Sequence, residues 1–271
     1  MQKYKMMVLD LDGTLLNGES QLEQKTKEAL QEIMWNGKKV TLCSSRSFEE
    51  MRTIIEELYQ DMKEQYCIGF GGACVYGTDG SIMGTGGLIE RENAERLIED
   101  ANRRNIHIHG YDEHTLYYYQ KTEAFRTFLA FADVKYIPME RLSYQEFLLK
   151  GYLKLMCLGD RRQLEDYDKK ASQIACTAFS NPAGQQGYLD ICRKNVSKKT
   201  GVALLCANLG ISKEECICVG DGENDIPMLN FAGLGIAMKN AGAQVKKAAD
   251  YVSCHTNLDY GVYYLVKKFM V

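Results

Sequence analysis

The sequence lacks any long apolar run, which bears on where the protein acts. No hydrophobic stretch among the 271 residues approaches the ~20 residues that a bilayer-spanning helix requires. The segment Met1–Asp10 contains two lysines and a short apolar run that ends in acid, which indicates a buried strand and not a secretion signal. We therefore expect a cytoplasmic protein with no membrane partner.

The chain also lacks an excess of positive charge. It has 33 lysine and arginine residues and 36 aspartate and glutamate residues, which gives a formal net charge of −3. Nucleic acids and anionic membrane surfaces favour proteins with a basic patch or stripe. The charge balance therefore predicts no nucleic-acid partner.

The ten cysteines lack the spacing of zinc-binding motifs. No pair is separated as Cys-x-x-Cys, and the nearest pair is Cys216 and Cys218, with one residue between them. Most lie in apolar surroundings, as in Val40–Cys43. In a reducing compartment such cysteines behave as small hydrophobic residues, so we interpret them as structural.

The residues that are present indicate an α/β fold. Hydrophobic residues make up 45% of the chain and charged residues 25%, as in ordinary globular proteins. Met6–Leu9 and Val40–Cys43 are apolar runs without alternation, which are typical of strands buried on both faces. Apolar residues with helical spacing follow each run, at 21–35 and 48–58. This order predicts a doubly wound, Rossmann-like parallel sheet covered by helices.

Two clusters of turn-forming residues predict an inserted domain. Asp79-Gly80 lies between two β-prone runs as in a hairpin, and a glycine-rich stretch follows at 84–87. A second cluster occupies Asn181–Gly184, after which a strand at 188–191 and a helix at 198–209 resume the first pattern. The predicted organisation is a discontinuous core of residues 1–85 and 186–271 with an inserted α+β cap domain of residues 86–185.

Polar residues stand at the ends of the predicted core strands. In open parallel sheets, binding sites form beyond the carboxyl ends of the strands. The first strand is followed by Asp10 and Asp12, the second by Ser44, Ser45 and Arg46, and Ile217–Val219 by Asp221, Asn224 and Asp225. Lys198 opens the helix after the strand expected at 188–191. We expect these side chains to converge.

Such a group of side chains suits a metal and a phosphate. Converging aspartates repel one another, and a divalent cation relieves this repulsion. Mg²⁺ prefers carboxylate oxygens, water and phosphate, and a lysine and a hydroxyl beside it suit a phosphoryl group. One Asp-Gly pair is explained equally well as a turn or a helix cap. Turns and helix caps do not explain why acidic clusters follow two separate strands and occur together with a lysine.

These residues resemble the motifs of the haloacid dehalogenase superfamily and, within it, of the Cof-type phosphatases. Asp10–Leu15 (DLDGTL) is similar to the first motif, Ser44 stands in the second, Val196–Lys198 is similar to the third and Gly220–Asp225 to the fourth. Three further segments are typical of the Cof-type branch: Ile226–Leu229, Gly235–Ala241 and Ala249–Val252. The resemblance covers the core, whereas in the insert it rests mainly on position and length.

The resemblance implies hydrolysis of a phosphomonoester through an aspartyl-phosphate. It assigns Asp10 as the nucleophile and Asp12 as the group that protonates the leaving oxygen and then activates water. It implies Mg²⁺ bound by Asp10, by Asp12 through its backbone carbonyl, and by Asp221. Asp225 would support this metal site through water or through the other ligands.

The resemblance also implies a set of phosphate-binding residues, some of which have unusual neighbours. The set is Ser44, Ser45, Arg46, Lys198 and Asn224. Ser45 carries a side chain where the family commonly has glycine, and Lys199 likewise replaces a glycine. Gly71–Ala73 stands where the family has Asn-Gly-Ala. These departures concern positioning and rate more than reaction type.

One strand of the insert has two chemically different faces. In Ile106–Tyr111, alternation places His107, His109 and Tyr111 on one face and the isoleucines on the other. We expect the isoleucine face to pack on helices of the insert. The histidine face either contacts substrate, as a specificity surface, or is solvated.

The function predicted from the sequence is a Mg²⁺-dependent phosphatase of small phosphorylated metabolites. Two alternatives stay open: a phosphotransferase or sugar-phosphate mutase on the same core, and a non-catalytic phosphometabolite-binding protein. The last is disfavoured by the joint presence of Asp10, Asp12, Lys198, Asp221 and Asp225. Sugar phosphates, pyridoxal phosphate, flavin mononucleotide and nucleotide monophosphates are equally compatible substrates, and the sequence predicts no oligomeric state.

Overall fold

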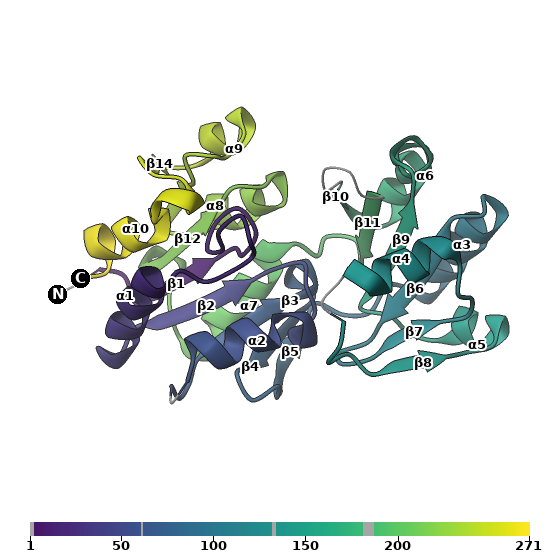
Figure 1. Cartoon of the computed structure of the whole chain (residues 1–271), viewed down its shortest axis with the longest axis horizontal. Coiled ribbons are helices and arrows are strands. Elements are labelled where there is room, and N and C mark those ends of the chain that lie inside the picture. Colours follow the sequence, from purple (N-terminus) through teal and green to yellow (C-terminus); the bar gives the residue numbers. More distant parts are fainter. Residues whose placement is uncertain (1–2, 61, 132–133, 181–186) are drawn as a thin grey trace. The chain divides into compact units, whose positions relative to one another are not determined.

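The chain folds into two compact units, each with its own β-sheet (Figure 1). The computed structural model describes residues 3–60, 62–131, 134–180 and 187–271. The first unit comprises Met1–Ser45, Met51–Thr85 and Ser197–Val271. The second comprises Arg46–Glu50 and Gly86–Val196.

The first unit is built on an eight-stranded sheet with the strand order β14-β13-β12-β1-β2-β3-β4-β5. Its strands are β1 (Met6–Leu9), β2 (Lys39–Cys43), β3 (Tyr66–Gly69), β4 (Cys74–Gly77), β5 (Ile82–Thr85), β12 (Cys216–Gly220), β13 (Leu234–Ala237) and β14 (Tyr251–Val252). The strands from β14 to β3 are parallel, while β4 and β5 add antiparallel pairs at one edge. Every residue of β1 and β12 is buried, as their apolar runs predicted.

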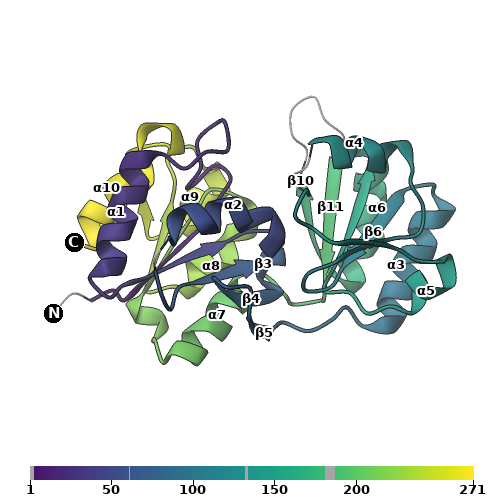
Figure 2. The same cartoon turned by 60° about the horizontal axis from the view of Figure 1, so that its bottom comes forward.

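Helices cover both faces of this sheet (Figure 2). They are α1 (Gln24–Trp35), α2 (Phe48–Leu58), α7 (Lys198–Leu209), α8 (Ile226–Phe231), α9 (Ala243–Ala248) and α10 (Gly261–Phe269). Side chains of α7, α8 and α9 pack in one cluster with Met6 and Val8 of β1. Helices α1, α2 and α10 lie on the opposite face (Figure 2). The predicted doubly wound α/β core is therefore confirmed.

The predicted hairpin at Asp79-Gly80 joins β4 and β5. The two strands pair antiparallel, and the Gly77 amide donates to the Ser81 carbonyl at 2.8 Å. Gly80 adopts a φ of +86°, a conformation that side chains rarely permit. This positive φ explains why the turn has a glycine at position 80.

The second unit is an α+β layer structure around a six-stranded sheet with the order β10-β11-β9-β6-β7-β8. Its strands are β6 (His107–Tyr111), β7 (Leu116–Tyr118), β8 (Met139–Arg141), β9 (Lys154–Gly159), β10 (Cys176–Ser180) and β11 (Gly187–Cys192). Its helices are α3 (Arg91–Arg103), α4 (Glu123–Phe131), α5 (Tyr144–Leu149) and α6 (Arg161–Ile174). One sheet face, including Ile108, forms a hydrophobic core with residues of α3, α5 and α6.

One strand expected in the core belongs to the second sheet. The run predicted as a strand at 188–191 forms β11, which pairs antiparallel with β9 and β10. The second unit consequently extends to Val196, beyond the boundary predicted at residue 185. An apolar run indicates a strand but does not specify which of two sheets it joins. The predicted linker Asn181–Gly184 lies outside the described residues.

The cysteines have the structural character that their surroundings predicted. All ten are free thiols, and eight of them are buried.

None of the helices in the described ranges is long and apolar enough to cross a bilayer.

Candidate active site

The carboxyl ends of three adjacent parallel strands carry the predicted site residues. Strand β1 lies between β12 and β2, with Leu9 in register with Val219 and Leu42. Parallel pairing brings the strand ends to one edge of the sheet, so Asp10, Ser44 and Asp221 emerge there together. The Asp10 amide extends the ladder by donating to the Val219 carbonyl at 3.0 Å.

A buried charge cluster lies at this edge. The Lys198 ammonium donates to Asp10 Oδ1 and, at 2.6 Å, to Asp225 Oδ1. Asp225 Oδ2 accepts hydrogen bonds from the amides of Asp221 at 3.0 Å and Gly222 at 2.9 Å. Relative exposure is 8% for Asp10, 2% for Lys198 and 0% for Asp225. Because Asp225 is fully paired by these donors, it holds Lys198 in place beside Asp10.

The same cluster has the donor atoms of a divalent-metal site. Carboxylate oxygens of Asp10, Asp221 and Asp225 lie within 4.8 Å of one another. Three carboxylates facing one ammonium leave an excess of negative charge when all are ionised. An all-oxygen donor set with excess negative charge fits Mg²⁺, which completes its octahedron with water and phosphate oxygens.

Burial and mutual repulsion shift the titration of these groups. Burial raises the pKa of Asp10 to about 8, with Lys198 opposing the shift and the Asp225 and Asp221 carboxylates adding to it. Burial also raises the pKa of Asp221, against the hydrogen bond from Thr14. For Lys198, burial lowers the pKa but the attraction of Asp10 and Asp225 outweighs it, so the pKa is raised. The mutual repulsion of Asp10, Asp221 and Asp225, which Lys198 offsets only in part, favours the binding of a further cation.

Two residues of the first motif, Thr14 and Gly13, shape this site although no role was predicted for either. Thr14 is fully buried, and its hydroxyl donates to Asp221 Oδ1 at 2.9 Å. Gly13 has a φ of +84°, and a Cβ there would lie 2.3 Å from Asp221 Oδ2. The hexapeptide resemblance contained both residues, but only the structure reveals that they contact Asp221.

The glycines at 71 and 72 allow the chain to pack closely against the start of α7. Gly72 has a φ of +103°, and a Cβ there would lie 1.9 Å from the Ser197 carbonyl oxygen. Gly71 has a φ of +62° and donates its amide to the Ser44 carbonyl at 2.9 Å. This left-handed conformation is open to both glycine and asparagine, which accounts for Gly71 where the family has Asn.

The remaining predicted residues differ in how the structure places them. Ser44 is buried at the end of β2, next to the strand that carries Asp10. Asn224 and Asp12 are exposed, and Asn224 directly precedes Asp225. Ser45 and Arg46 are half-buried, and Arg46 falls within the second unit.

The histidine face of β6 is buried, which neither expectation for it included. His107, His109 and Tyr111 are 2%, 0% and 1% exposed, and aromatic rings of α4 pack on the two histidines. The His107 ring stacks on Phe125 with centroids 4.5 Å apart, and His109 lies 5.1 Å from the Phe128 ring. The prediction that these three side chains form a specificity surface is therefore corrected. The isoleucine face does pack on the helices of the unit, as predicted.

Burial also fixes the protonation state of the two histidines. It lowers the pKa of His107 to about 4 and that of His109 well below its ordinary value. His109 Nε2 lies 3.2 Å from the Tyr111 hydroxyl. Both imidazoles are thus neutral at pH 7 and belong to an aromatic core.

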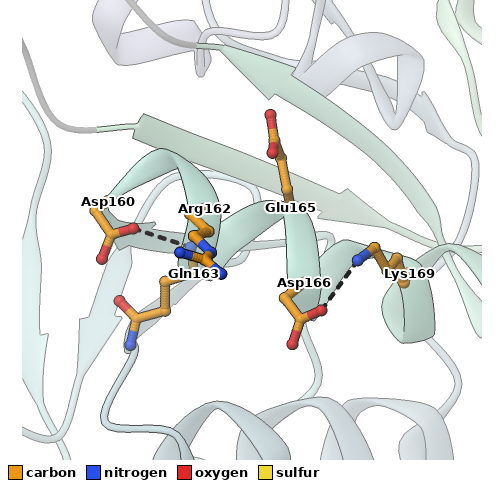
Figure 3. A pocket seen from close by; sticks show the side chains of 6 residues that line it. All are labelled: Asp160, Arg162, Gln163, Glu165, Asp166 and Lys169. Carbon is orange, nitrogen blue, oxygen red and sulfur yellow. Dashed lines mark hydrogen bonds and ion pairs between the residues drawn. The ribbon is translucent and has the colours of Figure 1, made fainter.

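A pocket of the second unit lies away from the predicted residues (Figure 3). It is lined by Asp160, Arg162, Gln163, Glu165, Asp166 and Lys169. Several of these side chains are paired: Asp160 accepts from the Gln163 amide at 3.0 Å, and Asp166 pairs with Lys169 at 3.1 Å. The arrangement is that of a solvated helix surface with paired charges.

Comparisons with known proteins agree with the motif resemblance. A protein called "Putative phosphatase YxeH" from Bacillus subtilis is 24% identical over 271 residues, covering 99% of each chain. A haloacid dehalogenase-like hydrolase from Bacteroides thetaiotaomicron superposes with a TM-score of 0.83 at 26% identity, over 98% of this chain and 99% of that one. A Thermotoga maritima protein gives a TM-score of 0.81 at 28% identity, over 98% and 97% of the two chains.

The family model extends the match across both units. The model of the haloacid dehalogenase-like hydrolases matches residues 7–266, which include the charge cluster and the whole insert. The match thus spans the buried Asp10–Lys198–Asp225 group and the strands that position it. From motif, fold and family model together, the chain belongs to the haloacid dehalogenase-like hydrolase family.

Proposed function

We propose that the chain is a Mg²⁺-dependent phosphatase of small phosphorylated metabolites that works through a phosphoryl group carried on Asp10. The observation that carries the proposal is the shared ammonium of Lys198, which joins Asp10 to a fully buried Asp225. A structural lysine needs only one carboxylate partner. A lysine bonded to two carboxylates that also face Asp221 supports a site that handles concentrated negative charge.

Asp10 is the proposed nucleophile. Lys198 bonds one of its carboxylate oxygens, which restricts the carboxylate to a single orientation. In the first step an Asp10 oxygen forms a bond to phosphorus while the bond from phosphorus to the leaving oxygen breaks. Such in-line displacement depends on positioning more than on other covalent chemistry, and a buried carboxylate held by a lysine supplies that positioning.

Asp12 is the proposed general acid and base. It lies two residues beyond Asp10 and is exposed, so it is accessible to a leaving group and to water. It would give its proton to the leaving oxygen in the first step. In the second step it would take a proton from the water that attacks phosphorus and restores the Asp10 carboxylate.

The remaining site residues would bind the Mg²⁺ ion and the phosphoryl oxygens. Asp10, Asp221 and the backbone carbonyl of Asp12 would bind Mg²⁺, which supplies electrostatic neutralisation of the phosphoryl oxygens when bound. Asp225 would orient Lys198 and the amides of residues 221 and 222. Ser44, Asn224 and Lys198 would donate to the phosphoryl oxygens, with Lys198 acting as a point charge.

The test is a screen of phosphorylated metabolites for phosphate release. We expect release in water with Mg²⁺ and no release in excess chelator, with Ca²⁺ a poor substitute because it prefers more ligands at longer distances. Release without any acceptor sugar separates a phosphatase from a mutase or phosphotransferase. Full activity in excess chelator would contradict the metal role of Asp221.

A further inference from the structure

The segment Gly235–Ala241 has no role in the mechanism above, yet it reaches the same edge of the sheet. Its strand, β13, is parallel to β12, with Ala237 in register with Gly220. The Met238 amide donates to the Gly220 carbonyl at 2.9 Å and continues the ladder. Asn240 therefore emerges beside the strand end that carries Asp221.

The side chain of Asn240 contacts the loop that follows Asp12. Asn240 Nδ2 donates to the Gly13 carbonyl at 2.7 Å, across a sequence separation of 227 residues. The backbone amide of Asn257 donates to Asn240 Oδ1 at 3.2 Å. A backbone N–H can only donate, so this contact fixes which side-chain atom is oxygen and directs the amide nitrogen at Gly13.

A second asparagine holds the far end of the same loop. Asn257 Nδ2 donates to the Leu16 carbonyl at 2.8 Å. The two asparagines are thus hydrogen-bonded to each other and to the loop, Asn240 at the Gly13 carbonyl and Asn257 at the Leu16 carbonyl. We call this pair of residues, Asn240 and Asn257, the asparagine clamp.

The gripped loop in turn sets the position of Asp221. Gly13 adopts its left-handed conformation directly against the Asp221 carboxylate, where even a methyl group would overlap. The next residue, Thr14, donates its hydroxyl to Asp221 Oδ1 at 2.9 Å. Glycine is the residue with the most backbone freedom, so an external bond to its carbonyl restricts the loop where it would otherwise move most.

We propose that Asn240 is a positioning residue, which fixes the Gly13 peptide so that Asp12 and Asp221 keep the geometry needed for cation binding and phosphoryl transfer. This inference rests on the proposed function. Asn240 is exposed, so its replacement should leave the buried core of the unit intact. Partners that orient metal ligands commonly change affinity or rate without unfolding the protein.

The test compares Asn240→Ala with a matched control in the full-length protein. Asn208 is also exposed and donates through Nδ2 to a backbone carbonyl, that of Met83, at 3.2 Å, away from the cluster. We expect Asn240→Ala to weaken Mn²⁺ binding, measured by titration calorimetry, by about 10- to 100-fold. With an aryl phosphate at saturating Mg²⁺, kcat should fall while KM changes little. Asn208→Ala should match the parent in both measurements, and both variants should keep the parental Tm.

Asn240→Asp provides a second variant of the same size. Its carboxylate cannot donate to the Gly13 carbonyl, so it should lose Mn²⁺ affinity and kcat as Asn240→Ala does. Mn²⁺ affinity and kcat in both Asn240 variants equal to those of Asn208→Ala would overturn the inference and leave the proposed function standing. A parent protein that binds no Mn²⁺ and releases no phosphate would overturn the proposed function and the inference with it.

Discussion

The Asp10–Lys198–Asp225 cluster of the first unit and the His107–His109–Tyr111 face of the second are both buried and polar, but they are compensated differently. In the cluster, each buried charge has an opposite charge within bonding distance. On the histidine face, aromatic rings surround imidazoles that stay neutral. The ring nitrogens of His107 find no hydrogen-bond partner within the described part of the chain.

The way the buried polar groups are compensated distinguishes a functional site from a structural core. Burying charges costs free energy even when they are paired, so a cluster with excess negative charge at a strand edge indicates a function. A neutral imidazole stacked on phenylalanine costs much less and serves as a somewhat polar core residue. Burial of a titratable side chain is therefore informative only together with the charge of its neighbours.

The largest effect that would sharpen this comparison is the loss of the nucleophile. Asp10→Asn should lower turnover by about a thousandfold or more, because an amide of the same shape is a poor nucleophile. The metal-free protein should remain folded, since one of several repelling carboxylates is gone. Steady-state phosphate release and thermal unfolding measure the two quantities. Turnover within tenfold of the parent would remove Asp10 from the mechanism.

A second change breaks the compensation itself. Lys198→Met would leave Asp10 and Asp225 buried together without a cation, and we expect the metal-free free energy of unfolding to fall by about 3–5 kcal/mol. Adding Asp225→Asn in the same chain should recover part of this loss. Urea unfolding gives these values, with Lys213→Met as control, since the Lys213 side chain is 58% exposed. Equal stabilities for the two lysine variants would mean that the cluster is not held by charge.

The smallest effect concerns the histidine face and pH. The folded-state pKa of His107 is about 4, below its ordinary value of 6.5, so the unfolded chain binds a proton that the folded chain does not between these values. Stability should therefore decline as pH falls through this window. His107→Phe should flatten the decline in denaturant midpoints measured between pH 7 and pH 5, while phosphate release at pH 7 stays parental. A large loss of activity in His107→Phe would restore a role in the reaction.

Sequence reasoning succeeded where the signal was local and chemical. The apolar runs Met6–Leu9 and Ile217–Val219 predicted buried parallel strands, with the aspartates after them at one edge, and the two runs do pair in parallel. Lys198 followed from the resemblance of Val196–Lys198 to the third motif, and the structure pairs it with Asp10. The periodicity of α1 and α2 likewise fixed their faces.

Sequence reasoning failed where the answer depended on distant partners. The run at 188–191 indicated a strand, and only the pairing of β11 with β9 and β10 places it in the second sheet. The alternation of Ile106–Tyr111 predicted the two faces of the strand correctly. It could not predict what packs on the histidine face, because Phe125 and Phe128 come from α4, another part of the chain. The bond from Asn240 to Gly13 spans 227 residues and leaves no local pattern.

The measurement that tests the central claim most directly is the capture of the phosphoryl group on Asp10. In Asp12→Asn, an aryl phosphate needs no proton for its leaving group, so transfer to Asp10 should proceed, but the asparagine cannot take the proton of the attacking water. We predict one rapid equivalent of released aryl alcohol, followed by a stall. Mass spectrometry of the quenched protein should then find one phosphoryl group on the peptide that contains Asp10. Absence of the modification, or its survival in a variant that also carries Asp10→Asn, would contradict the account.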